Sequence, residues 1–243
     1  MRVIADIGSN WNTLDDCMRA IKFASKDDID IVKFQYFTQE KLYGGERSPS
    51  TKRKGELPKA WIPRLAAQCE VSGVEFMCSV FDVHDVEYID KYVNMHKIAS
   101  AEATYKRLIS KCVDTGKPVL VSCGCVDPWH LSHDVSPMAC VADYPAESVP
   151  LKDLIFLSNQ FAESGVPFGY SDHCIKHKDF SYNLALEMGA SAYEFHYNPL
   201  NLSTPDTPHS RDKFIRPKPF KQTRNKDIAR VQTSEGWYRK LDG

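Results

Sequence analysis

The sequence lacks several features that would assign a class of protein at once. Its 243 residues carry 31 Lys+Arg against 32 Asp+Glu, so no excess of charge points to nucleic acid or to a membrane surface. The N-terminus "MRVIADIGSNWN" has no signal-peptide pattern, because its apolar run is short and an acid interrupts it. No apolar run approaches the length of a transmembrane helix. We therefore expect a cytoplasmic protein with no nucleic-acid or membrane partner.

Zinc-type cysteine spacing and a nucleophile elbow are absent as well. Eight cysteines without a signal peptide favour free thiols over a disulfide framework. The closest pair, Cys123 and Cys125, has one residue between its members, which is not the spacing of a zinc site. No G-x-S-x-G motif is present, so Ser171 beside His173 does not indicate a nucleophilic serine.

What the sequence does contain is a regular alternation of short β-rich runs and helical segments. Several runs are apolar on both faces, like strands buried on both sides, and several helical segments end in Gly, a C-cap signal. Such repeats predict parallel strands with right-handed crossovers. Eight units in about 250 residues indicate an α/β fold of the (β/α)8 TIM-barrel type. The expected strands are residues 2–8, 30–37, 75–81, 96–101, 118–124, 138–144, 167–173 and 192–198.

We expect residues 1–243 to form one barrel domain with three irregular segments. Only "CVDPWHLSHDVSP" separates the fifth and sixth strands, so the helix there must be shortened or missing. The tail after the eighth strand is broken by prolines, and residues 225–241 offer an eighth helix. The polar loop 38–59 leaves the second strand, and we interpret it as a lid on the catalytic face, with a flexible excursion as the alternative.

Polar side chains gather near the C-terminal ends of most expected strands, and in a barrel these ends converge on one pocket. Lysines and carboxylates in apolar strands cost free energy unless they are paired or bind a ligand, so we interpret the set as a functional pocket. Ammonium and hydroxyl groups together suit a phosphate or a carboxylate. The set comprises Lys33, Gln35, Ser79, Lys97, Ser100, Glu102, Ser122, Asp143, Tyr144, Ser171, Asp172, His173, Glu194 and His196.

Two histidines in this set suggest a metal ion. His173 and His196 belong to neighbouring expected strands, so their imidazoles are candidate ligands of one divalent ion. Asp172, Glu194 or Asp206 would complete or orient that site.

The same residues carry a resemblance to a known family. Eight segments, in order, resemble the catalytic barrel of the N-acetylneuraminate (sialic acid) synthase family, which includes legionaminic and pseudaminic acid synthases and spore-coat polysaccharide proteins. The resemblance runs from about Arg2 to Ser210 and does not extend to the C-terminal antifreeze-like domain of that family, so we expect the catalytic barrel alone. The segments are "IADIGSNWN", "VKFQYF", "KIASAEAT", "GKPVLVSCG", "DYPA", "GYSDH", "GASAYEFHYN" and "TPDTPHS".

The resemblance implies a transferase that condenses phosphoenolpyruvate with the aldehyde of an N-acylated amino sugar. The products would be a nonulosonic, sialic-acid-like 2-keto acid and phosphate, and the oligomeric state stays open. Lys33, Ser79, Lys97, Ser100, Ser122 and Ser171 match the phosphoenolpyruvate contacts of the family. His173 and His196 match its ligands for Mn2+ or another divalent metal, and Glu102, Tyr144 and Asp206 match its sugar contacts. Catalytic roles fall to His173, His196, Glu102 and Lys97.

Departures from the family pattern keep two other functions open. Trp11 stands where the family has His, Asp6 where it has Glu, and Ala139 and Ala142 replace polar side chains. One alternative is another TIM-barrel aldolase or ketose-acid synthase that acts on a phosphorylated sugar. The other is a degenerate homologue that binds a sugar or a partner protein without turnover. A Schiff-base aldolase would be trapped by borohydride at a lysine, whereas a metal-dependent condensation would not.

Overall fold

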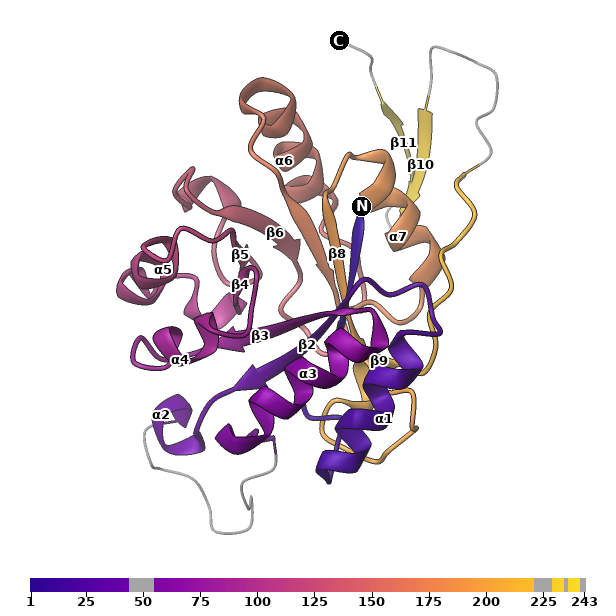
Figure 1. The fold of residues 1–243 in the computed structure, drawn as a ribbon. Coiled ribbons are helices and arrows are strands. Elements are labelled where there is room, and N and C mark those ends of the chain that lie inside the picture. The colour runs from indigo at the N-terminus through magenta and orange to yellow at the C-terminus, as the bar shows by residue number, and fades with distance from the viewer. Residues whose placement is uncertain (44–54, 221–228, 234–235, 241–243) are drawn as a thin grey trace.

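A closed barrel of parallel strands forms the centre of the protein (Figure 1). This computed structural model describes residues 1–43, 55–220, 229–233 and 236–240. Each of the first eight strands pairs with the next along the chain, and β1 also pairs with β8, which closes the barrel and confirms the expected (β/α)8 fold. The strands are β1 (Arg2–Asp6), β2 (Ile31–Tyr36), β3 (Glu75–Val80), β4 (His96–Ile98), β5 (Val119–Ser122), β6 (Ser136–Cys140), β7 (Gly169–Asp172) and β8 (Ala192–Tyr197).

Helices cover the outside of the barrel and begin and end where the sequence signals predict. Thr13 caps the first helix in a capping box with Asp16, whose backbone N–H donates to Thr13 Oγ1 over 3.2 Å. The third and sixth helices end at Gly73 and Gly165, which have φ of 72° and 71°, the left-handed backbone that glycine adopts at low cost. The helices are α1 (Leu14–Ala24), α2 (Gln39–Tyr43), α3 (Ile62–Ser72), α4 (Val86–Asp90), α5 (Lys106–Val113), α6 (Leu151–Ser164) and α7 (Lys178–Glu187), with 3-10 turns η1 (Lys59–Trp61), η2 (Ser100–Glu102), η3 (Pro128–His130) and η4 (Thr207–His209).

The outward side chains of the strands are mostly apolar, and the inward side chains change from apolar to polar along the strands. A small inner cluster, which includes Ile31, Met77 and Leu120, fills the N-terminal part of the barrel. Because side chains alternate between the two faces of a strand, the next inward positions fall two residues later. Those positions hold Lys33, Ser79 and Ser122. The apolar cluster therefore forms a floor, and the polar side chains stand above it at the C-terminal end.

One of the irregular segments matches the prediction from the sequence, and another contradicts it. Between β5 and β6 the helical structure is the single turn η3, as expected for a shortened helix. In place of the predicted eighth helix, β10 (Ala229–Thr233) and β11 (Gly236–Lys240) pair antiparallel. The prediction was wrong because the β-branched and aromatic residues of A-R-V-Q-T and G-W-Y-R-K favour strands. The central part of the predicted lid, residues 44–54, lies outside the described residues.

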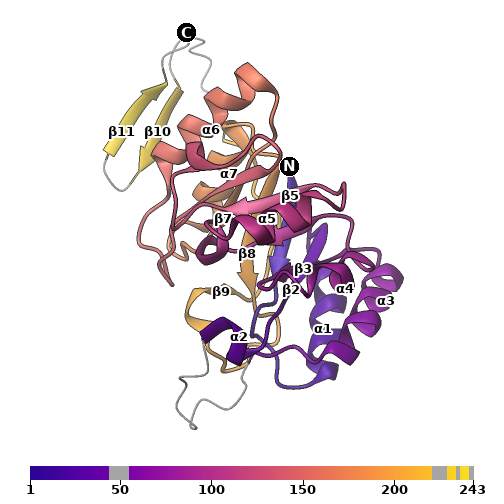
Figure 2. The same cartoon turned by 90° about the vertical axis from the view of Figure 1, so that its left-hand side faces the viewer.

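The two ends of the barrel carry different segments. In both views α2 and β9 (Ser210–Arg211) lie at the lower end, whereas the hairpin of β10 and β11 lies at the upper end (Figure 2). None of the described helices is long and apolar enough to span a membrane. Because α2 follows the C-terminal end of β2, the C-terminal ends of the strands lie at this lower end.

A buried ion pair fixes β9 to the barrel. Arg211 follows the 3-10 turn η4, and its guanidinium donates to Asp172 Oδ2 over 2.5 Å and to the Tyr193 hydroxyl over 2.6 Å. Asp172 also accepts hydrogen bonds from the hydroxyls of Tyr170 and Ser181, at 2.8 and 2.6 Å. Both charged side chains are almost fully buried, and a buried pair is stable only when its remaining hydrogen bonds are satisfied, as they are here.

Removing one partner of this pair should therefore destabilise the protein strongly. We expect Arg211→Met to lower the free energy of unfolding by about 3–5 kcal/mol, because it leaves the Asp172 carboxylate buried without its counter-charge. Chemical denaturation measures the loss. As a control, Arg64→Met changes an exposed arginine of α3 and should stay within about 0.5 kcal/mol of wild type. A loss below about 1 kcal/mol in Arg211→Met would contradict the structural role of the pair.

Candidate active site

The side chains at the C-terminal ends of the strands line one cavity of ≈ 740 Å³. The sequence predicts that these positions converge, and in the structure all the residues that the resemblance matches to substrate or metal contacts reach this cavity. They are Lys33, Ser79, Lys97, Ser100, Glu102, Ser122, Tyr144, Ser171, His173, His196 and Asp206. Gln35 and Glu194 line it as well, whereas Asp143 is exposed beyond the end of β6 and does not. The flanks of the long loop also contribute, through Phe37, Gln39 and Gly55.

Two buried lysines share one buried glutamate at the centre of the cavity. Glu194 of β8 lies 3.7 Å from the Lys33 ammonium and 3.6 Å from the Lys97 ammonium, and Asp6 lies 2.7 Å from Lys33. Burial acts to raise the pKa of Glu194, but the two lysines outweigh it and lower the pKa to about 2. Burial acts to lower the pKa of Lys33, yet Asp6 and Glu194 raise it above its usual value. Lys33 is therefore held protonated.

Lys97 has a weaker set of partners than Lys33. Burial lowers its pKa, and Glu194 offsets only part of that effect. Its ammonium donates to Ser122 Oγ over 2.7 Å and to the carbonyl of Ile98 over 3.2 Å. A buried ammonium whose one carboxylate is shared with Lys33 gains from an additional anion, so Lys97 is well suited to bind a negatively charged ligand.

Serine hydroxyls surround the two lysines. Lys33 donates to Ser79 Oγ over 3.1 Å, and Ser171 donates to Glu194 Oε1 over 2.9 Å. Ser100 stands at the opposite wall, where its Oγ accepts from the backbone N–H of Gly124. Each hydroxyl can rotate to donate to an anion, so the cavity floor offers both charge and neutral donors.

His173 and Tyr144 form one side of the cavity mouth. His173 Nδ1 lies 2.7 Å from the carbonyl of Val141, so this nitrogen carries the proton and Nε2 keeps its lone pair. Burial, together with neighbouring His196, lowers the pKa of His173 to about 4, which leaves its ring neutral at neutral pH. The Tyr144 ring, carried by the loop after β6, lies 4.1 Å from the His173 ring between centroids.

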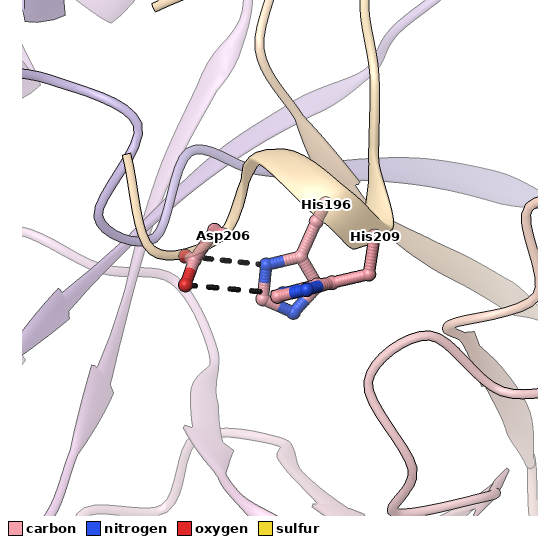
Figure 3. Close-up of side chains that lie close together, drawn as sticks. All are labelled: His196, Asp206 and His209. Carbon is pink, nitrogen blue, oxygen red and sulfur yellow. Dashed lines mark ion pairs between the residues drawn. The ribbon is translucent and has the colours of Figure 1, made fainter. Parts of the chain in front are cut away.

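Next to them, His196, Asp206 and His209 come together (Figure 3), and the Tyr144 ring lies 5.0 Å from the His209 ring between centroids. Asp206 Oδ2 lies 3.4 Å from His196 Nδ1, and Asp206 Oδ1 lies 3.8 Å from His209 Nε2. One ligand-type atom from each residue lies within 4.8 Å of the other two, so these residues could hold a metal ion. His209 is not among the residues predicted from the sequence, although the segment "TPDTPHS" places it three residues after Asp206.

Asp172 does not take part in this site. The sequence suggests that it completes or orients the metal site, but its side chain points out of the barrel, where it pairs with Arg211. Because side chains alternate along a strand, inward Ser171 and His173 require outward Asp172. Its effect on the cavity is indirect, through the β9 segment that Arg211 anchors.

The amino-acid sequence matches a known protein family and several of its members. Residues 20–236 match the model of the NeuB family. The chain is 27% identical over 243 residues to the pseudaminic acid synthase of Helicobacter pylori, covering 87% of this chain and 70% of that protein. It is 29% identical over 240 residues to an uncharacterised protein of Methanocaldococcus jannaschii, covering 92% of this chain and 68% of that protein. The chain thus spans about two thirds of these relatives.

Solved structures show the same fold. A crystal structure of N-acetylneuraminic acid synthetase from Leptospira borgpetersenii superposes with a TM-score of 0.77 at 24% identity, covering 86% of this chain and 78% of that one. The spore coat polysaccharide biosynthesis protein SpsE of Bacillus subtilis gives a TM-score of 0.71, covering 86% and 63%. The resemblance seen in the sequence is thereby confirmed, and with it the expectation of an enzyme. The match over residues 20–236 identifies the chain as a member of the NeuB family.

Proposed function

We propose that the protein condenses phosphoenolpyruvate with the aldehyde of an N-acylated amino sugar, giving a nonulosonic 2-keto acid and phosphate. The observation that carries the proposal is the pair of buried lysines, ringed by four serines, at the floor of a cavity whose mouth holds imidazoles. Phosphoenolpyruvate is a small dianion or trianion, and this floor offers two ammonium groups and several hydroxyl donors. The pseudaminic acid synthase among the relatives supports the same class of product.

In this proposal Lys33 and Lys97 bind the anionic groups of phosphoenolpyruvate. Lys33 is held in place by Asp6 and Glu194, so its charge is fixed before the substrate arrives. Lys97 has the weaker carboxylate contact, and it would gain most from the bound anion. The same two charges would stabilise phosphate as it leaves. Ser79, Ser100, Ser122 and Ser171 would orient the substrate by donating hydrogen bonds.

The donor set at the cavity mouth fits a divalent metal ion. Imidazole and carboxylate groups are ligands that first-row transition ions prefer, and the buried His196 Nδ1 has no hydrogen-bond partner among the described residues. An ion here would be held by His196 together with either His173, as the resemblance implies, or Asp206 and His209. It would supply Lewis-acid polarisation of the aldehyde oxygen, and Mn2+ is the ion that the resemblance implies.

Glu102 and Tyr144 would bind the sugar. Glu102, in the turn after β4, has a buried Oε2 without a hydrogen-bond partner among the described residues. This oxygen faces the cavity and would accept from a hydroxyl or amide N–H of the acceptor. Tyr144 also lines the cavity and is half exposed, so its ring can pack against a sugar.

The proposal predicts acceptor-dependent release of phosphate. Phosphoenolpyruvate, Mn2+ and a broad panel of N-acylated hexosamines should give phosphate in a coupled assay with at least one acceptor. His196→Ala should abolish this release while the protein stays folded, and His130→Ala, an exposed histidine of η3, should leave it unchanged. No release with any acceptor would count against the proposal. Borohydride trapping of substrate on Lys97 would favour a Schiff-base aldolase instead.

Lys97→Ala should mainly weaken the binding of phosphoenolpyruvate. A hydrogen bond to a charged group contributes roughly 1.5–3 kcal/mol, so we expect KM for phosphoenolpyruvate to rise about ten- to a hundredfold. Steady-state kinetics with each substrate varied in turn measures this. Lys106→Ala changes an exposed lysine of α5 and should match wild type. An unchanged KM with a lowered kcat would move Lys97 from substrate binding to the chemical step.

The raised pKa of Glu102 predicts that the stability of the protein depends on pH. Burial raises this pKa from 4.5 to about 7, since a backbone hydrogen bond and the charge of Lys97 offset only part of that effect. Between these values the folded protein keeps a proton that the unfolded chain releases, so this group makes stability fall as pH rises from 4.5 to 7. Glu102→Gln should therefore gain stability relative to wild type across this window, as measured by denaturation at several pH values. Glu70→Gln, exposed on α3, is the control, and parallel curves for Glu102→Gln and wild type would refute the assignment.

A further inference from the structure

Several buried polar atoms of the protein lack a hydrogen-bond partner. Among the described residues there are seven such side-chain atoms, and four of them belong to residues that line the cavity. Leaving a buried polar atom unpaired costs free energy, so such an atom in a cavity indicates where a polar group of a ligand binds. The four atoms are Ser9 Oγ, Glu102 Oε2, Glu194 Oε2 and His196 Nδ1.

Three of these four atoms already have a role in the proposed function. Glu194 faces the two lysines, His196 is a candidate ligand of the ion, and Glu102 would accept from the sugar. The hydroxyl of Ser9 has no role there, and Ser9 is not among the residues predicted from the sequence. It lies in the loop between β1 and α1, at the rim of the cavity.

The backbone of Ser9 is held in place on both sides of its side chain. Its N–H donates to Asp206 Oδ2 over 2.8 Å, and its carbonyl accepts from the N–H of Trp11 over 2.8 Å. Gly8, which precedes it, has φ of 53°, and a Cβ there would stand 2.2 Å from Asp206 Oδ2, so only glycine allows this approach. The Ser9 hydroxyl therefore has a fixed place on the cavity wall before any ligand arrives, which lowers the entropic cost of binding.

The surroundings of Ser9 favour a neutral hydroxyl group over an anion. The cationic groups of the cavity, Lys33 and Lys97, are paired with Glu194, whereas the side chain that contacts the Ser9 backbone is the Asp206 carboxylate. A carboxylate repels a phosphate or a second carboxylate. A sugar hydroxyl both donates and accepts, so it can donate to Asp206 while it accepts from Ser9 Oγ.

We propose that Ser9 is a specificity-determining residue, whose hydroxyl binds one hydroxyl group of the acceptor sugar beside Asp206. The inference rests on the proposed function, because it adds a recognition residue to the same cavity. Glu102 offers another unpaired atom in the turn after β4, and β2 and β3 separate that strand from β1 in the closed barrel. An acceptor that satisfies both atoms carries polar groups at separate positions, as an open-chain amino sugar does.

The first test measures stability without any ligand. Ser9→Ala removes a hydroxyl that has no partner among the described residues, so its thermal midpoint should equal or exceed that of wild type. The matched control is Ser210→Ala, which should lower the midpoint by about 2–4 °C. Ser210 Oγ donates to the Asp206 carbonyl over 2.6 Å and accepts from Asn10 Nδ2 over 2.9 Å. Equal losses in the two variants would show that Ser9 has a structural partner and would overturn the proposal.

The second test removes the hydroxyl from the sugar and from the protein in turn. Monodeoxy analogues of the acceptor that supports phosphate release are compared in wild type and in Ser9→Ala. A hydrogen bond between neutral groups corresponds to about a two- to tenfold change in binding, so one analogue should show this rise of KM in wild type and no rise in Ser9→Ala. Ser9→Ala should raise KM for the unmodified acceptor by the same factor and leave KM for phosphoenolpyruvate unchanged.

Calorimetric titration with N-acetylhexosamines covers the case in which no acceptor supports turnover. Sugar binding that is weaker in Ser9→Ala than in wild type, without phosphate release, would refute the proposed function and leave this inference standing. Phosphate release with additive losses for every analogue, or with an equal rise of KM for phosphoenolpyruvate, would overturn the inference and leave the proposed function intact. A wild type that binds none of the sugars would overturn the inference as well.

Discussion

The shared contact of Glu194 with two buried lysines is the constraint on which the rest of the site depends. An ammonium group inside a barrel loses its hydration, and only a nearby anion repays that cost. Glu194 lies within 3.7 Å of Lys33 and Lys97, and Asp6 adds a second carboxylate at Lys33. Lys33, which has both carboxylates, is thereby held protonated next to the apolar cluster that fills the N-terminal part of the barrel.

The barrel separates two kinds of chemistry along its strands. The ammonium and hydroxyl groups proposed to bind the anion lie on β2, β3, β4, β5 and β7 and in the turn η2, beyond the apolar inner cluster. The imidazoles lie at the ends of β7 and β8 and, together with Asp206, in the segment before β9. Asp6 connects the two regions, because its Oδ2 lies 2.7 Å from the Lys33 ammonium and 3.8 Å from His196 Nε2. The two groups of side chains therefore line one continuous cavity.

Most of the fold could be predicted from the sequence, because each strand and helix is specified by local patterns. Each expected strand overlaps an observed one, although β6 lies earlier than predicted and leaves Asp143 and Tyr144 in the loop after it, and Gly73 and Gly165 end their helices. The C-terminal tail was predicted wrongly, because the helix expected over residues 225–241 competes with the strand preference of its β-branched and aromatic residues. The convergence of lysines, serines and histidines could also be predicted, because a closed barrel brings all strand ends to one mouth.

The sequence by itself determined the barrel, its polar end and the family, because apolar periodicity and short motifs are local properties of the chain. The tertiary structure alone decided which neighbours each polar group has. The Asp172 side chain pairs with Arg211 on the outside of the barrel, because side chains alternate along β7 and those of Ser171 and His173 point inward. His209 proved to lie beside His196, since the chain returns along β8 through the pairing of His196 with Ser210. Such contacts depend on register between distant segments, which no single stretch of sequence specifies.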